Sequence, residues 1–136
     1  MPNSVAPNSF SRALSLVKER LAGAAKRARR LPEDVDILTV TKTISTERME
    51  EALALGLRQF GESRVQEALS KRTLLADRFP PEKAPRWHLI GHLQSNKVRR
   101  AVELFDCIQS VDSLNWPNCW PKKGSGGPSR SVVWWK

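Results

Sequence analysis

Apolar residues recur along the chain in two alternating rhythms, one typical of helices and one typical of buried strands. A 3.6-residue period from Phe10 to Ala28 predicts an amphipathic helix that starts at Ser9 and stops before Pro32. Short apolar and β-branched runs follow near residues 37, 57, 87 and 106, each separated from the next by a helical segment. This alternation predicts an α/β fold with a parallel sheet and right-handed crossovers.

The later elements are bounded by prolines, glycines and capping residues. Predicted strands cover 36–42, 57–60, 87–90 and 105–111, and predicted helices cover 46–56, 65–79 and 95–104. Gly56 closes the first of these helices, Pro80 ends the second, and Ser95 is expected to cap the third. Asp112 and Ser113 are expected to start a further helix. Four such βα steps fit either a small open sheet or half of a (β/α)₈ barrel, and periodicity does not distinguish them.

The first predicted strand leads directly into a lysine. Residues 37–41 are all β-favouring, which is typical of a strand buried on both faces. Lys42 then lies at the carboxyl end of the strand, where α/β folds gather their ligands. An ammonium group that is partly desolvated has a lowered pKa, and its amine becomes available as a nucleophile toward a carbonyl. The alternative is that this side chain simply extends into solvent.

Composition leaves a second class of function open. With 136 residues, the chain is one domain or an incomplete piece of a larger one. Its net charge of +9 suits a polyanion-binding surface, so a nucleic-acid-binding module is the alternative function. However, the densest basic groups, at 26–30 and 97–100, fall at or on predicted helices, and no recognised reader motif accompanies them.

The cysteines, the histidines and the apolar runs bear on cellular location, membrane insertion and metal binding. Cys107 and Cys119 form no metal or redox spacing, and without a secretory signal they favour a cytoplasmic setting. The first 30 residues carry a single acid, Glu19, and weakly resemble a transit peptide. No apolar run is long enough to span a bilayer. His88 and His92 lack a third ligand, so no metal site is expected.

Three motifs carry a resemblance to a known family. They are Val40–Thr43 (VTKT), Gln59–Glu67 (QFGESRVQE) and Trp87–Lys97 (WHLIGHLQSNK), and 105–114 continues the match. In this order and spacing they closely resemble the pyridoxal phosphate homeostasis protein family, over roughly residues 10–114. The resemblance implies a parallel (β/α) barrel of TIM type, like the amino-terminal domain of alanine racemase. About the first four βα units of that barrel are expected here.

The resemblance also implies a function. Lys42 matches the lysine on which the family holds pyridoxal 5′-phosphate as a Schiff base, in intracellular homeostasis of the cofactor. Members are implied to be non-catalytic carriers, with pyridoxal-phosphate-dependent apoenzymes as recipients and no membrane or nucleic-acid partner. A racemase-like enzyme would need a second catalytic residue that the sequence does not show. Ser63 stands where the family commonly has Asn, and His88 is a candidate for the cofactor face.

Residues 115–136 break the pattern. Four of the five Trp of the chain lie there, and Pro117 and Pro121 would interrupt the expected helix. When GC-rich codons are assigned to the tail and then read from one base earlier, they encode a helix-forming sequence. The tail is therefore predicted to be frameshifted or disordered. Residues 1–9 are predicted to be flexible. The resemblance implies that the second half of the barrel supplies the phosphate cup and an arginine facing the pyridine nitrogen. Half a barrel is expected to expose its inner face, to be poorly stable or self-associating, and to bind the cofactor less well.

Overall fold

Residues 9–110 and the short strand at 131–132 are described by the computed structural model of the chain. The chain divides into a unit within 1–37 and a unit within 38–136, and each is described by itself. In the first, α1 (Ser9–Arg27) is followed by the 3₁₀ turn η1 (Pro32–Asp34). The predicted helix is confirmed: Lys26 and Arg27 lie in its last turn, where cations complement the helix dipole.

The second unit is a parallel sheet with helical crossovers. Its strands are β1 (Leu38–Val40), β2 (Gln59–Glu62), β3 (Arg86–Leu89), β4 (Cys107–Ile108) and β5 (Ser131–Val132). The α-helices between them are α2 (Thr46–Ala54), α3 (Val65–Leu75) and α4 (Val98–Leu104), and 3₁₀ turns occur at η2 (Pro81–Lys83) and η3 (Ser95–Lys97). Every strand pairs in parallel with the next one along the chain.

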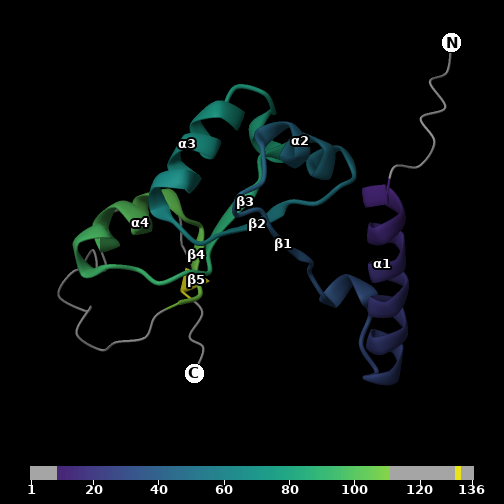
Figure 1. Cartoon of the computed structure of the whole chain (residues 1–136). Coiled ribbons are helices and arrows are strands. Elements are labelled where there is room, and N and C mark those ends of the chain that lie inside the picture. The colour runs from purple at the N-terminus through teal and green to yellow at the C-terminus, as the bar shows by residue number, and fades with distance from the viewer. Residues whose placement is uncertain (1–8, 111–130, 133–136) are drawn as a thin grey trace, which may run out of the picture. The chain divides into compact units, whose positions relative to one another are not determined.

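Strand order decides between the two architectures that periodicity left open. The order is β1-β2-β3-β4-β5, with no reversal. Successive right-handed crossovers in one direction place every helix on the same face, and α2, α3 and α4 lie along one face of the sheet in Figure 1. A doubly wound sheet would instead reverse its order and carry helices on both faces. The α/β prediction is confirmed, and the arrangement is that of consecutive units of a (β/α) barrel.

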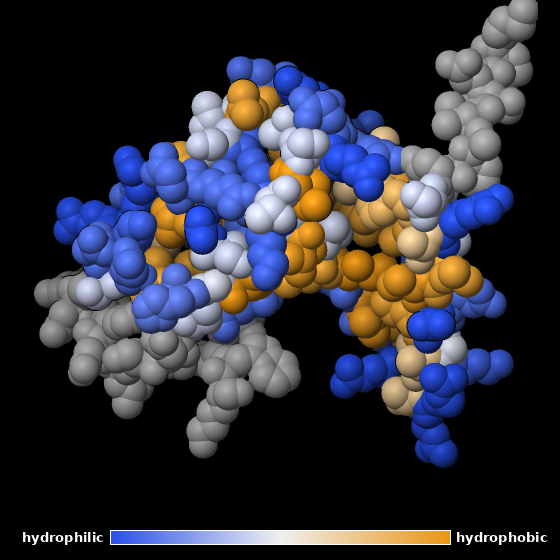
Figure 2. All heavy atoms as spheres, viewed as in Figure 1, coloured by the Kyte–Doolittle hydropathy of each residue, from blue (hydrophilic) through white to orange (hydrophobic). Residues whose placement is uncertain are grey.

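The face of the sheet under the helices forms the core. Phe60 and Trp87 are register partners whose rings pack edge to face with centroids 5.9 Å apart, so both side chains lie on this face. Leu89, two residues after Trp87, is on the same face by strand alternation and is fully buried. Met49 of α2 and Val98 of α4 are likewise fully buried. The outer surface over α3 and α4 is mainly hydrophilic in Figure 2.

The opposite face is much less covered. Val40 is 48% exposed, and Leu38, Gln59 and Ile90 are only partly buried. The prediction that the first strand is buried on both faces is therefore wrong for this chain. The physical reason is that, within the described residues of the sheet unit (38–110 and 131–132), no second layer covers this face and β1 pairs only with β2.

Two strand boundaries differ from the prediction, and local hydrogen bonding explains the shift. Leu57, predicted to open the second strand, donates its N–H to the Ala52 carbonyl, and Gly56 donates to Leu53. With Gly56 at φ 88°, these bonds form a Schellman-type end to α2, so β2 begins only at Gln59 and extends through Glu62. The predicted strand 105–111 corresponds to β4, and its residue 111 lies outside the described part of the chain. The strand starts later than predicted because the Phe105 N–H still bonds to the Ala101 carbonyl of α4.

The expected cap at Ser95 is also wrong. Ser95 is the first residue of η3, and the preceding Gln94 makes no side-chain cap hydrogen bond. A 3₁₀ turn closed by the Lys97 N–H on the Gln94 carbonyl takes the place of a side-chain cap.

Several predictions fall on residues outside the described part of the chain. These include the flexible terminus, apart from Ser9, and the helix start at Asp112 and Ser113. Most of 115–136 is also outside, although β5 pairs with β4 in the position that the next strand of a barrel would take. A frameshifted tail therefore stays a prediction. Among the described residues, no helix has the length and apolar character needed to cross a membrane.

Candidate functional site

Lys42 lies in a tight turn at the carboxyl end of β1. The Ile44 N–H bonds to the Thr41 carbonyl at 3.1 Å, so Lys42 and Thr43 are the two central residues of the turn. Lys42 is exposed, and no described residue forms a hydrogen bond or ion pair with its ammonium group. The desolvation that the sequence suggested at this position is thus not provided by the described part of the chain.

Thr43 adopts a conformation that its side chain disfavours. Its φ is 63°, in the left-handed region that glycine usually occupies at this position of a turn. For a β-branched residue such backbone costs on the order of 1–3 kcal/mol and persists only where the surroundings hold it.

A buried lysine on α3 holds the turn at 41–44 through the Thr41 carbonyl. Lys71 of α3 is 7% exposed, and its ammonium donates to the Thr41 carbonyl at 2.5 Å. It also pairs with Glu62 Oε1 at 2.7 Å and Glu67 Oε1 at 2.9 Å. All three donors of the ammonium group are therefore used, which compensates its removal from water.

Glu62 is the most deeply buried charge of this cluster. Its side chain is 0% exposed at the end of β2, and the Thr41 hydroxyl donates to its Oε1 at 2.6 Å. The Thr41 N–H continues the β1–β2 ladder by bonding to the Gly61 carbonyl. The residue before Lys42 is thus fixed through its N–H, its hydroxyl and its carbonyl.

Glu67 holds the turn at the residue after Lys42. Its Oε1 accepts the Thr43 N–H at 2.7 Å, and its side chain is 29% exposed. The Lys71 ammonium first, and the Thr43 N–H second, hold the pKa of Glu67 below its ordinary value of 4.5.

This lowered pKa predicts a pH-dependent contribution to stability. Because the pKa of Glu67 is lower in the folded than in the unfolded chain, its contribution is complete above about pH 4.5 and is lost as pH falls through the folded pKa. We expect Glu67→Gln to lower the free energy of unfolding at neutral pH and to converge with the wild type in acid. Urea titrations of both proteins at several pH values measure this, and a pH-independent difference would contradict it.

A polar row crosses the open face of the sheet. His88 lies in β3, with its Nε2 2.5 Å from Gln59 Oε1 and its Nδ1 3.3 Å from Gln109 Nε2. Gly61, the register partner of His88 on β2, leaves room beside this row, since an added Cβ would meet Ile90 Cδ1 at 3.2 Å. His88 is thus placed on the open face as the sequence suggested, and a role toward the cofactor stays a prediction.

Ser63 and Gly91 bring the ends of β2 and β3 into close contact. A Cβ at Gly91 would lie 2.3 Å from the Ser63 carbonyl oxygen and 2.7 Å from its Cα. Only glycine permits this approach, which sets the position of Ser63 at the same edge of the sheet as Lys42.

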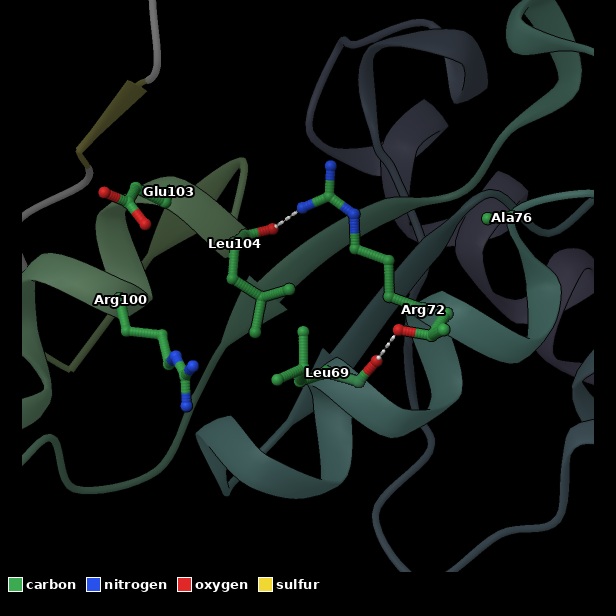
Figure 3. Close-up of a pocket in the computed structure, with 7 residues that line it drawn as sticks. Leu69, Arg72, Ala76, Arg100, Glu103 and Leu104 are labelled. Atoms are coloured by element: carbon green, nitrogen blue, oxygen red, sulfur yellow. Dashed lines mark hydrogen bonds between the residues drawn. The ribbon is translucent and has the colours of Figure 1, made fainter.

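The remaining candidate features lie away from the turn that carries Lys42 or form no metal site. His92 is exposed on the loop after β3, and no group of three or more His, Cys, Asp or Glu within the described residues could hold a metal ion. An open hollow of about 500 Å³ lies between α3 and α4 on the helical side (Figure 3). There Arg72 reaches across to donate to the Leu104 carbonyl at the end of α4, so it caps that helix.

Sequence reasoning missed Glu62, Glu67 and Lys71. Glu67 and Lys71 are four residues apart, which usually indicates an exposed ion pair on a helix surface. The predicted second strand ends at residue 60, before Glu62, whereas β2 extends through Glu62. The available signal was the helical spacing of Val65, Ala68 and Leu75, whose inward series Lys71 continues.

Comparisons with known proteins point to one family. A scan against protein-family models found no match. Curated relatives named pyridoxal phosphate homeostasis protein include one from Pseudomonas aeruginosa, 45% identical over 101 residues, which are 74% of this chain and 42% of the relative. One from Escherichia coli is 37% identical over 107 residues, 79% of this chain and 45% of the relative.

Solved structures give the same result. PipY of Synechococcus elongatus, solved with pyridoxal phosphate bound, matches with a TM-score of 0.59 and 45% identity, over 75% of this chain and 45% of PipY. An unknown protein from Bifidobacterium adolescentis matches with a TM-score of 0.62 and 34% identity, over 75% of this chain and 44% of that protein. These names favour the cofactor-binding interpretation over the nucleic-acid alternative. The chain spans less than half the length of these relatives, and over that part it is similar to proteins named pyridoxal phosphate homeostasis protein and to PipY.

Proposed function

We propose that this chain binds pyridoxal 5′-phosphate covalently through Lys42 and takes part in intracellular homeostasis of the cofactor. The observation that carries the proposal is the position of Lys42, exposed and unpaired among the described residues, in a turn held on both sides by a buried ionic cluster. PipY, which is similar over 75% of this chain, has been solved with pyridoxal phosphate bound.

The described residues provide an amine and hydrogen-bonding groups that suit part of the cofactor. When bound, the cofactor would supply an electrophilic aldehyde, which suits a reversible C=N bond to a lysine amine with release of one water. The Lys42 side chain would supply the amine. The half-buried row of His88, Gln59 and Gln109 offers hydrogen-bonding groups on the open face of the sheet. Ser63, at the end of β2, adds a hydroxyl to the same edge.

The test is selective labelling. Purified protein is mixed with pyridoxal phosphate, its visible spectrum is recorded, and the adduct is reduced with borohydride and mapped by mass spectrometry. We expect the label at Lys42 and loss of the visible band in Lys42→Arg, because arginine keeps the positive charge but has no nucleophilic amine. Lys83→Arg, at an exposed lysine of η2, is the matched control and should retain the band.

The same experiment can contradict the proposal. If the label spreads over many lysines in proportion to their exposure, or Lys42→Arg keeps the band, the proposal is wrong.

The finer points of the proposal concern role and location. A carrier needs a reversible bond to the aldehyde but no acid and base acting on a substrate. We propose such a non-catalytic role, with apoenzymes that use pyridoxal phosphate as recipients. A cytoplasmic location is part of the proposal, supported by the buried free thiol of Cys107, since unpaired cysteines are common where thiols are kept reduced.

A further inference from the structure

We propose that Glu67 is a positioning residue for Lys42: its carboxylate holds the turn at 41–44 in the conformation that places the Lys42 backbone at the carboxyl edge of the sheet. This inference rests on the proposed function, and it concerns a residue of α3 that acts through the Thr43 backbone.

The first argument is backbone strain. Thr43 has a φ of 63°, which a β-branched residue does not adopt without support. Its N–H points to the Glu67 carboxylate, 2.7 Å away, and a hydrogen bond to a charged acceptor is among the stronger ones available to a backbone amide. Glu67 therefore offsets the strain at the residue that follows Lys42.

The second argument is the rigidity of the support. Glu67 is not a loose surface carboxylate, because its Oε1 also pairs with the Lys71 ammonium at 2.9 Å. Lys71 in turn holds the Thr41 carbonyl at 2.5 Å and the fully buried Glu62 at 2.7 Å. One ionic cluster thus holds the residues on both sides of Lys42, so the turn cannot shift without breaking its hydrogen bonds to these charged groups.

The third argument is that Lys42 itself has no other restraint. Its side chain is exposed and makes no hydrogen bond or ion pair within the described residues. A lysine on a mobile backbone would react with an aldehyde no better than any other exposed lysine, whereas a lysine whose backbone is held loses less conformational freedom when the bond forms.

The experiment compares Glu67→Ala, Glu67→Gln and the control Glu103→Ala, at an exposed residue of α4. Two quantities are measured: amide hydrogen exchange at Thr43 without ligand, and the ratio of borohydride-trapped pyridoxal phosphate at Lys42 to that at Lys83. We expect Glu67→Ala to speed Thr43 exchange and lower the labelling ratio, each by about tenfold, the size expected for loss of one hydrogen bond to a charged group. Glu67→Gln keeps an acceptor oxygen and should restore most of both quantities.

Each outcome decides the matter. Exchange at Phe60, a fully buried strand residue, reports global unfolding. In Glu67→Ala, exchange should rise more at Thr43 than at Phe60, which separates a local effect from a loss of overall stability. A labelling ratio in Glu67→Ala equal to that of Glu103→Ala overturns the positioning role while leaving the proposed function intact. Equal labelling of Lys42 and Lys83 in the wild type contradicts the proposed function, and the positioning role falls with it even if Thr43 is protected.

Discussion

Replacing Lys71 with methionine is expected to lower the free energy of unfolding by about 3–5 kcal/mol, the usual cost of removing one partner from a buried ion pair. Methionine fills a similar volume but leaves the Glu62 carboxylate, 0% exposed, without its cation. The Thr41 carbonyl and Glu67 lose the same donor. Domains have about 5–15 kcal/mol of stability in total, so this variant should approach the limit of folding.

A double-variant comparison isolates the cause. Lys71→Met combined with Glu62→Leu removes both charges, and we expect it to be more stable than Lys71→Met alone. Lys97→Met, at an exposed lysine of η3, should have little effect. Urea unfolding followed by circular dichroism, together with soluble yield, gives the comparison. If Lys71→Met proves as stable as Lys97→Met, the buried cluster contributes little to stability.

Alanine at Gly91 is expected to destabilise the sheet unit by at least the roughly 1–3 kcal/mol typical of overpacking. Its Cβ would lie 2.3 Å from the Ser63 carbonyl oxygen, and backbone cannot move aside as a flexible side chain can. The clash would push apart the ends of β2 and β3, so selective labelling of Lys42 should fall as well. Denaturant midpoints and the Lys42 labelling ratio measure the two effects.

Gly61→Ala is the matched control. Its Cβ would lie 3.2 Å from Ile90 Cδ1, the far end of a flexible side chain, and 3.5 Å from Ile90 Cγ2 and Leu38 Cγ, so a small change is expected. If Gly91→Ala proves as mild as Gly61→Ala, the close contact between Ser63 and Gly91 does not constrain this edge.

Element identity was largely readable from the sequence, because it depends on local periodicity and breakers. The helix from Ser9 and the strand around Trp87 were placed within a few residues. Predicted boundaries were wrong where the hydrogen bonds of a helix end continue past the last helical residue, as at Leu57, whose N–H completes the end of α2. Periodicity also could not choose between an open sheet and a barrel segment, because strand order depends on which segments pair.

For the site, the sequence by itself determined that a lysine follows the first strand of a parallel α/β unit, together with the motifs that mark its family. The tertiary structure alone decided what surrounds that lysine. Whether a charged residue on a helix faces water or the sheet depends on the rotation of that helix against strands distant in sequence. The structure rotates Lys71 inward to meet Glu62 and the Thr41 carbonyl, an arrangement that no local pattern specifies.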